Sequence, residues 1–110
     1  MSDELTVEDA KLVTLAQGAR GRIAAVQGAA VRDQMGRTYS AANVGAGEFR
    51  LSATQLVVAQ ALAAGASGLE LAVVLGVEQV DLELLRAFAG TGVAVLRCSV
   101  TGEILERLST

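Results

Sequence analysis

The run Leu69–Leu75 is the feature of this chain that most limits how it can fold. Glu70 is its only polar residue, so the run is typical of a strand that other elements cover on both faces. Helical patterns precede and follow it in the sequence. A buried strand between helical segments predicts a layered α/β structure, in which helices pack on a central sheet.

The other segments extend this pattern along the chain. Apolar residues at helical spacing, and extended apolar runs, predict the order α-β-β-α-β-α-β-β. The helices are expected over residues 7–19, 53–64 and 80–88, and the strands over residues 23–32, 37–44, 69–75, 93–97 and 104–108. The predicted fold is a three-layer α/β/α sandwich around one mixed five-stranded sheet. We expect one domain over residues 1–110, with residues 1–5 as a flexible acidic tail.

Local signals mark where several elements begin or turn. Thr6 and Ser52 are typical helix N-cap residues, and Gln55 completes a capping box with Ser52. Residues 33–36 have the form Asp-x-x-Gly and predict the turn of a β-hairpin. Residues 45–50 are expected to form a loop. Small side chains in the first strand would let a helix or a neighbouring strand approach closely.

The residue types that the chain lacks exclude several kinds of chemistry. It has no histidine, which excludes imidazole as a catalytic base, a zinc ligand or a pH switch. Cys98 is the only cysteine, so no disulfide can form within the chain, and we expect a small buried hydrophobic residue there. The net charge of −3 argues against nucleic acid as a partner. The apolar stretches are shorter than a membrane span, and we expect a cytoplasmic protein with no membrane partner.

Three segments of the chain resemble the nucleoside cytidine deaminase family. Residues 28–44, GAAVRDQMGRTYSAANV, are similar to the family's VGAAL-x-x-x-DG-x-x-Y-x-G-x-NVEN segment. Residues 51–59, LSATQLVVA, are similar to its LTLCAERVA helix start, and residues 84–88, LLRAF, to the end of its PCGACRQVLxEF helix. Order and spacing agree from residue 7 to residue 108. The resemblance implies the fold of that family, which agrees with the α/β pattern above.

The resemblance also implies that the functional residues of the family are replaced here. The family holds a zinc ion through one Cys or His that precedes a Glu, and through the two Cys of a PCxxC motif. The metal activates a water, and the Glu transfers its proton. The first ligand falls on Thr54 and the Glu on Leu56, while the two thiolates fall on Glu78 and Asp81. Of the nucleoside-binding residues, Asn43 alone matches. The resemblance therefore implies a degenerate member of the family, and we expect no metal or other cofactor.

Two functions remain open on these grounds. In the first, the chain is a non-catalytic, deaminase-like scaffold that binds a partner or itself. In the second, it is a hydrolase of the nucleoside (cytidine) deaminase type, in which Glu48, Glu78 and Asp81 hold a hard cation or act as acid and base. Carboxylates at a helix start also complement the helix dipole, which is the structural interpretation of Glu78 and Asp81. The sequence favours the scaffold, because a leucine at position 56 cannot move a proton.

The predicted helix at residues 53–64 is apolar around most of its circumference. One sheet covers only about half of such a helix, and the rest would form a larger apolar patch than a small monomer usually exposes. We therefore expect a homo-oligomer, either a dimer or a tetramer, with Val57, Val58, Ala61 and Leu62 at the interface. The alternative is that the helix belongs entirely to the core of its own chain.

Overall fold

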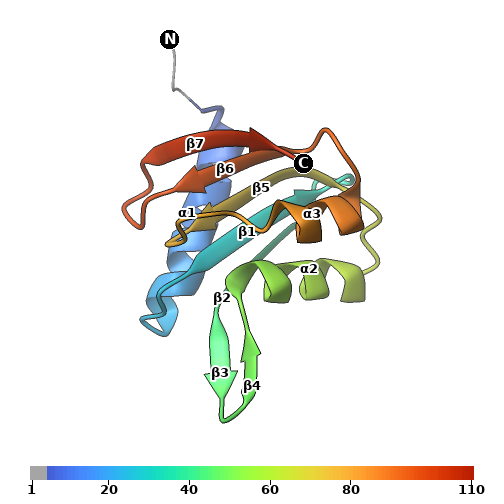
Figure 1. Ribbon diagram of the computed structural model, residues 1–110. Coiled ribbons are helices and arrows are strands. Elements are labelled where there is room, and N and C mark those ends of the chain that lie inside the picture. Colours follow the sequence, from blue (N-terminus) through green and yellow to red (C-terminus); the bar gives the residue numbers. More distant parts are fainter. Residues whose placement is uncertain (1–4) are drawn as a thin grey trace.

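A mixed five-stranded sheet lies at the centre of the structure, a computed structural model that describes residues 5–110 (Figure 1). The strands are ordered β2-β1-β5-β6-β7, and a separate two-stranded sheet pairs β3 with β4. The helices are α1 (Val7–Arg22), α2 (Ala53–Ala63) and α3 (Leu82–Ala89). The strands are β1 (Gly28–Asp33), β2 (Thr38–Ala42), β3 (Val44–Ala46), β4 (Phe49–Leu51), β5 (Leu69–Leu75), β6 (Ala94–Cys98) and β7 (Ile104–Ser109).

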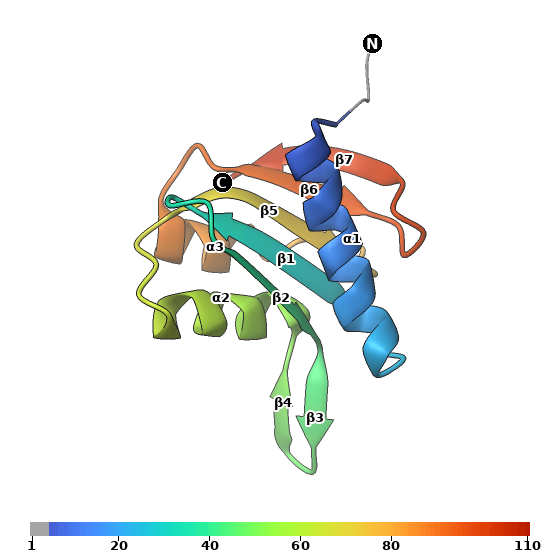
Figure 2. The same ribbon diagram turned by 180° about the vertical axis from the view of Figure 1, so that it is seen from behind.

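The central strand β5 is buried except at Glu70, as its apolar sequence predicts. It runs parallel to β6, and the other neighbours in the five-stranded sheet are antiparallel. Helix α1 covers one face of the sheet, while α2 and α3 cover the other (Figures 1 and 2). The predicted three-layer α/β/α sandwich with one mixed five-stranded sheet is therefore confirmed.

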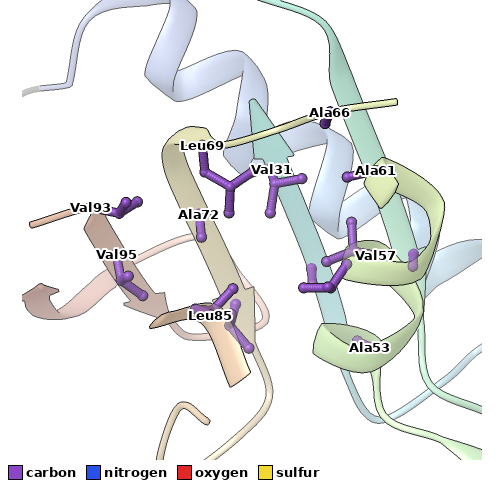
Figure 3. Close-up of a cluster of buried hydrophobic side chains, with 14 residues drawn as sticks. Val31, Ala53, Val57, Ala61, Ala66, Leu69, Ala72, Leu85, Val93 and Val95 are labelled. Carbon is purple, nitrogen blue, oxygen red and sulfur yellow. The ribbon is translucent and has the colours of Figure 1, made fainter. Parts of the chain in front are cut away.

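Each face of the sheet has its own hydrophobic core. Beneath α1, the buried side chains of Leu12 and Ala16 share a cluster with Leu75. Beneath α2 and α3, Val57 and Leu85 belong to a second cluster that also includes residues of β1, β5 and β6 (Figure 3). Burying one such leucine or valine side chain contributes about 1.5–3 kcal/mol. Because helices cover both faces of the sheet, the side chains on both of its faces are apolar.

The first helix is longer than the sequence predicts. Helix α1 continues through Gly18 and Gly21 and ends at Arg22 instead of near residue 19. Its buried face packs on the sheet, and this packing outweighs the helix propensity that each glycine loses, about 1 kcal/mol relative to alanine. The expected close approach is found at Gly28, where a Cβ atom would lie 2.4 Å from the carbonyl oxygen of Ala16. A side chain at this position would push α1 away from β1.

The N-terminal prediction is tested only in part. Of the predicted tail at residues 1–5, residues 1–4 lie outside the described residues. Leu5 is half-buried and packs against the core beneath α1, so it belongs to the fold and not to a tail. Within residues 5–110, none of the helices combines the length and the apolar character that crossing a membrane requires.

The predicted β1–β2 hairpin is confirmed, and its turn is built around the fully buried carboxylate of Asp33. This carboxylate accepts hydrogen bonds from the backbone N–H groups of Met35 and Arg37 (both 2.9 Å), from Arg37 Nε (2.8 Å) and from the hydroxyl of Tyr39 (2.9 Å). Burial alone would raise the pKa of Asp33, but the hydrogen bonds, led by that from Tyr39, outweigh burial and lower the pKa to about 2. Asp33 is therefore ionised at neutral pH, and the turn depends on it.

Residues 45–50, which the sequence predicts as a loop, lie instead in a second β-hairpin. Val44 pairs with Leu51 and Ala46 with Phe49, and Gly47 turns the chain with a positive φ of 61°. Each strand has three residues, too few to show the alternation on which a strand prediction depends. The hairpin extends away from the sheet (Figures 1 and 2). The side chain of Phe49 is 61% exposed.

Helix α2 uses most of its apolar residues within its own chain. Val57, Val58 and Ala61 are buried in the core between α2 and the sheet, and Figure 3 shows Val57 and Ala61 there. Leu62 is 55% exposed. The side chains of these first three residues are thus almost entirely covered within their own chain. Of the four positions expected at an interface, only Leu62 lies at the surface.

Candidate functional site

The start of α2 is the centre of the candidate site, because Thr54 and Leu56 both lie in its first turns. Thr54 is 5% exposed, and Leu56 is half-buried and packs against the core beneath α2. The predicted capping box is confirmed: Ser52 Oγ accepts from the N–H of Gln55 (3.0 Å), and Gln55 Oε1 accepts from the N–H of Ser52 (2.9 Å). Two backbone N–H groups at the start of α2 therefore already donate to side chains of the same segment.

A residue that the sequence analysis missed, Gln27, completes this set of hydrogen bonds. Its Oε1 accepts a hydrogen bond from the N–H of Ala53 (3.0 Å) at the beginning of α2. The N–H of Gln27 in turn donates to Oδ1 of Asn43 (2.8 Å). Asn43 thus fixes the segment that carries Gln27, and Gln27 occupies a donor that a ligand at the helix N-terminus would otherwise receive. In the sequence, Gln27 is the one polar side chain in a run of small and apolar residues, and that isolation was the only indication of a hydrogen-bonding role.

The start of α3 holds the other two expected positions. Asp81 is the N-cap of α3, and its carboxylate accepts a hydrogen bond from the N–H of Leu84 (3.1 Å). Glu78 is exposed in the segment between β5 and α3. Arg97 Nη1 holds that segment through the carbonyl oxygen of Val77 (3.1 Å). The structural interpretation of Asp81 is therefore confirmed, because this carboxylate caps the N-terminus of α3.

The structure brings the expected acidic residues to different elements. Glu48 lies in the β3–β4 hairpin, whereas Glu78 and Asp81 lie before and at the start of α3. Within the part of the chain that the structure describes, no three His, Cys, Asp or Glu side chains gather as a metal site would require. Cys98 is buried in the core beneath α1, on the opposite face of the sheet, and burial raises the pKa of its thiol. The described residues thus offer neither a thiolate nor an acidic cluster at the start of α2.

Removing the Gln27 side chain tests its role in closing α2. We expect Gln27→Ala to reduce the free energy of unfolding by about 1 kcal/mol, since it leaves the N–H of Ala53 without its acceptor. Gln27→Glu keeps an acceptor oxygen and adds negative charge at a helix N-terminus, so it is expected to retain the stability. Urea unfolding of both variants gives the comparison. Equal losses in the two variants would contradict the capping role.

The comparisons with known proteins agree on one family. Residues 5–102 match the family model described as cytidine deaminase-like. Cytidine deaminase from Burkholderia pseudomallei has a TM-score of 0.79 at 19% sequence identity, covering 96% of this chain and 93% of that one. Cytidine deaminase from Mycobacterium leprae has a TM-score of 0.70 at 18% identity, with coverage of 84% and 89%. A mutant cytidine deaminase from Mycobacterium tuberculosis has a TM-score of 0.69 at 19% identity, with coverage of 82% and 85%. No curated protein sequence matches the chain.

Proposed function

This chain belongs to the cytidine deaminase-like family, and from that premise we propose that it is a non-catalytic member that acts by binding, as an oligomeric scaffold. The observation that carries the proposal is Leu56. The resemblance assigns the proton-transferring Glu of the family to this position, and here a half-buried leucine packs against the core instead. A leucine has no proton to give or accept, so general acid–base catalysis at this position is excluded.

The residues at the zinc positions do not fit the metal. Thr54 supplies a hydroxyl, and Glu78 and Asp81 supply carboxylates, whereas structural and catalytic zinc in this type of site needs nitrogen or thiolate ligands. The carboxylate of Asp81 is already engaged by the N–H of Leu84. These three side chains therefore do not make a zinc site.

The carboxylate-based hydrolase finds less support. It needs Glu48, Glu78 and Asp81 close together, but Glu48 lies in the β3–β4 hairpin and the other two lie before and at the start of α3, and no acidic cluster forms among the described residues. A general base must also reach the proton that it removes, at about 2.6–3.2 Å. A capping carboxylate and two separate acidic side chains do not meet that requirement.

Self-association is the form of binding that the exposed apolar surface favours. A groove between α2 and α3 is lined by Val58, Leu62, Leu84, Ala87 and Phe88. Together with the half-buried Leu56, it leaves apolar surface on both sides of the buried face of α2. We propose a homo-oligomer, a dimer or a tetramer, with α2 at or beside the interface. We expect no nucleic-acid partner, because the net charge is −3. We also propose a cytoplasmic location.

Zinc content and deaminase activity test the non-catalytic assignment. Protein purified without chelator is expected to hold well under one zinc per chain by elemental analysis, since it has no imidazole and its one thiol is buried in the opposite core. Cytidine and deoxycytidine are expected to remain unchanged, because losing a general acid–base alone typically costs about 10²–10⁴-fold in rate.

The control for this test is an active zinc-dependent cytidine deaminase, purified and assayed in the same way. One zinc per chain would contradict the proposal. Turnover at constant specific activity through successive purification steps would contradict it as well, whereas activity that separates from the protein reports a contaminant.

A further inference from the structure

The two edges of the five-stranded sheet are β2 and β7, and the outer side of β2 is open. In the β1–β2 hairpin, the N–H of Asp33 donates to the carbonyl oxygen of Arg37 (2.8 Å). Because hydrogen-bonded and non-bonded positions alternate in an antiparallel pair, the backbone groups of Tyr39 and Ala41 also point toward β1. Those of the three remaining residues point outward: Thr38, Ser40 and Ala42. Within residues 5–110, no hydrogen bond uses these outward groups.

The two edges differ in how they are protected. Edge strands in monomeric proteins usually carry charges or proline that prevent pairing with another chain. Strand β7 includes Glu106 and Arg107. Strand β2 has the sequence TYSAA, with no charge and no proline. The two edge strands therefore differ in charge, because β7 carries charged side chains and β2 carries none.

A groove runs along the open edge of β2. Its floor includes residues of β2 itself, and its two sides come from the end of α1 and from α2. The lining residues are Ala19, Arg22, Ile23, Ser40, Ala41, Ala42, Val44, Leu56 and Gln60. Ile23 is 57% exposed, so this edge offers apolar contact area beside its free backbone groups. Strand pairing here would bury side chains as well as satisfy hydrogen bonds.

We propose that β2 pairs antiparallel with β2 of a second copy of this chain, with Ser40 on the twofold axis, so that two sheets join into one. This inference rests on the self-association proposed above and names its surface. In this register Thr38 lies opposite Ala42 of the second copy, and Tyr39 lies opposite its Ala41. All outward backbone groups of β2 are then paired, and only small or uncharged side chains face each other.

The position of α2 is compatible with this arrangement. Helix α2 lies over both β1 and β2. Neighbouring strands are about 4.8 Å apart, so a helix centred between β1 and β2 would lie about 10 Å from its copy across the new pair. Interaxial distances of 8–10 Å are those of packed helices. The sheet pairing and a helix–helix contact would therefore form together.

The side of α2 that lies toward the β2 edge suits such a contact. Leu56 and Gln60 line the groove, and Ala63 follows at the same helical spacing and is exposed. This stripe is short and uncharged, so two copies could meet without like charges. In this arrangement Leu56 would contact α2 of the second copy. Leu62 lies on the other side, toward α3, and belongs to a different surface.

Proline at an outward position tests the pairing directly. Ser40→Pro removes an outward N–H and leaves the bonds to β1 in place, as edge strands tolerate. Light scattering at micromolar concentration is expected to show the mass of the assembly halved. Ser109→Pro is the matched control: Thr110 N donates to Val93 O (3.0 Å), so Ser109 points outward at the β7 edge. It is expected to leave the mass unchanged.

A cysteine pair guards against the possibility that proline disturbs the fold. Ser40→Cys replaces one small side chain by another, and Cα atoms of a hydrogen-bonded antiparallel pair are about 5.5 Å apart, within the range for a disulfide. Mild oxidation is expected to yield a covalent dimer on a non-reducing denaturing gel. Ser109→Cys is expected to stay uncrosslinked under the same conditions. Cys98 is buried and does not compete.

The outcomes separate this inference from the proposed function. An oligomer that survives Ser40→Pro in folded form, together with no crosslink through Ser40→Cys, overturns the β2 interface and leaves self-association through another surface in place. A monomeric unmodified protein overturns both the interface and the oligomeric scaffold. The zinc and deaminase measurements report on the non-catalytic assignment independently of either result.

Discussion

Replacing Asp33 by alanine is expected to lower the melting temperature by about 10 °C or more. The buried carboxylate satisfies two backbone N–H groups of the β1–β2 turn, the guanidinium of Arg37 and the hydroxyl of Tyr39. Alanine leaves these four donors without their acceptor, and losing hydrogen bonds to a charged group costs more than losing neutral ones. Thermal unfolding followed by circular dichroism measures the change. Glu48→Ala, at an exposed residue of the β3–β4 hairpin, is the control and is expected to have little effect.

The effect of Asp33 is also expected to depend on pH. The pKa of Asp33 is about 2 in the folded protein, below its ordinary value of 3.8, so folding favours the ionised form. The stability that ionised Asp33 contributes is therefore fully present above about pH 4 and is lost as the pH falls toward 2. The difference in melting temperature between the unmodified protein and Asp33→Ala should shrink over that interval. A difference that stays constant from pH 6 to pH 2 would contradict the assignment.

Substituting alanine for Gly76 is expected to reduce the free energy of unfolding by more than about 3 kcal/mol. Gly76 follows β5 and has a positive φ of 76°, which side chains rarely adopt. A Cβ atom there would also lie 2.1 Å from the carbonyl oxygen of Val26, and a backbone atom cannot move aside as a flexible side chain can. The substitution would displace the segment that leads to Gln27.

Gly65→Ala provides the matched control for this prediction. Gly65 also has a positive φ, 89°, but no atom lies within 4 Å of a Cβ built there. Gly65→Ala is therefore expected to reduce the free energy of unfolding only by the cost of the positive φ, about 1 kcal/mol. Urea unfolding midpoints of the two variants separate the cost of a positive φ from the cost of the contact between the new Cβ atom and the carbonyl oxygen of Val26. Similar losses at both positions would show that the approach to Val26 is unimportant.

Much of this fold could be predicted because its signals are local. The capping box at Ser52 and the turn at Asp33 each depend on residues a few positions apart, so the sequence displays them. The strand β5 is stabilised by distant segments, but its own residues are apolar, and that pattern is visible in the sequence. The order of helices and strands then leaves the layered α/β/α arrangement as the favoured solution.

Other features depended on contacts between distant segments. Helix α1 passes two glycines because the sheet holds its buried face, and the short strands of the β3–β4 hairpin have no periodic signal. Gln27 reaches the first turn of α2 from a residue 26 positions earlier. Val57, Val58 and Ala61 belong to the core, since the sheet covers more of α2 than its apolar sequence implied.

The same division holds for function. The sequence by itself determined that the chain has no histidine and that a leucine stands where the family has its Glu, because residue identity fixes which side chains can carry protons or bind zinc. Only the tertiary structure decided that Gln27 accepts a hydrogen bond at the start of α2 and donates one to Asn43, and that the uncharged strand β2 forms an edge of the sheet. These outcomes depend on which segments meet in space, and a linear pattern of residue types does not specify those meetings.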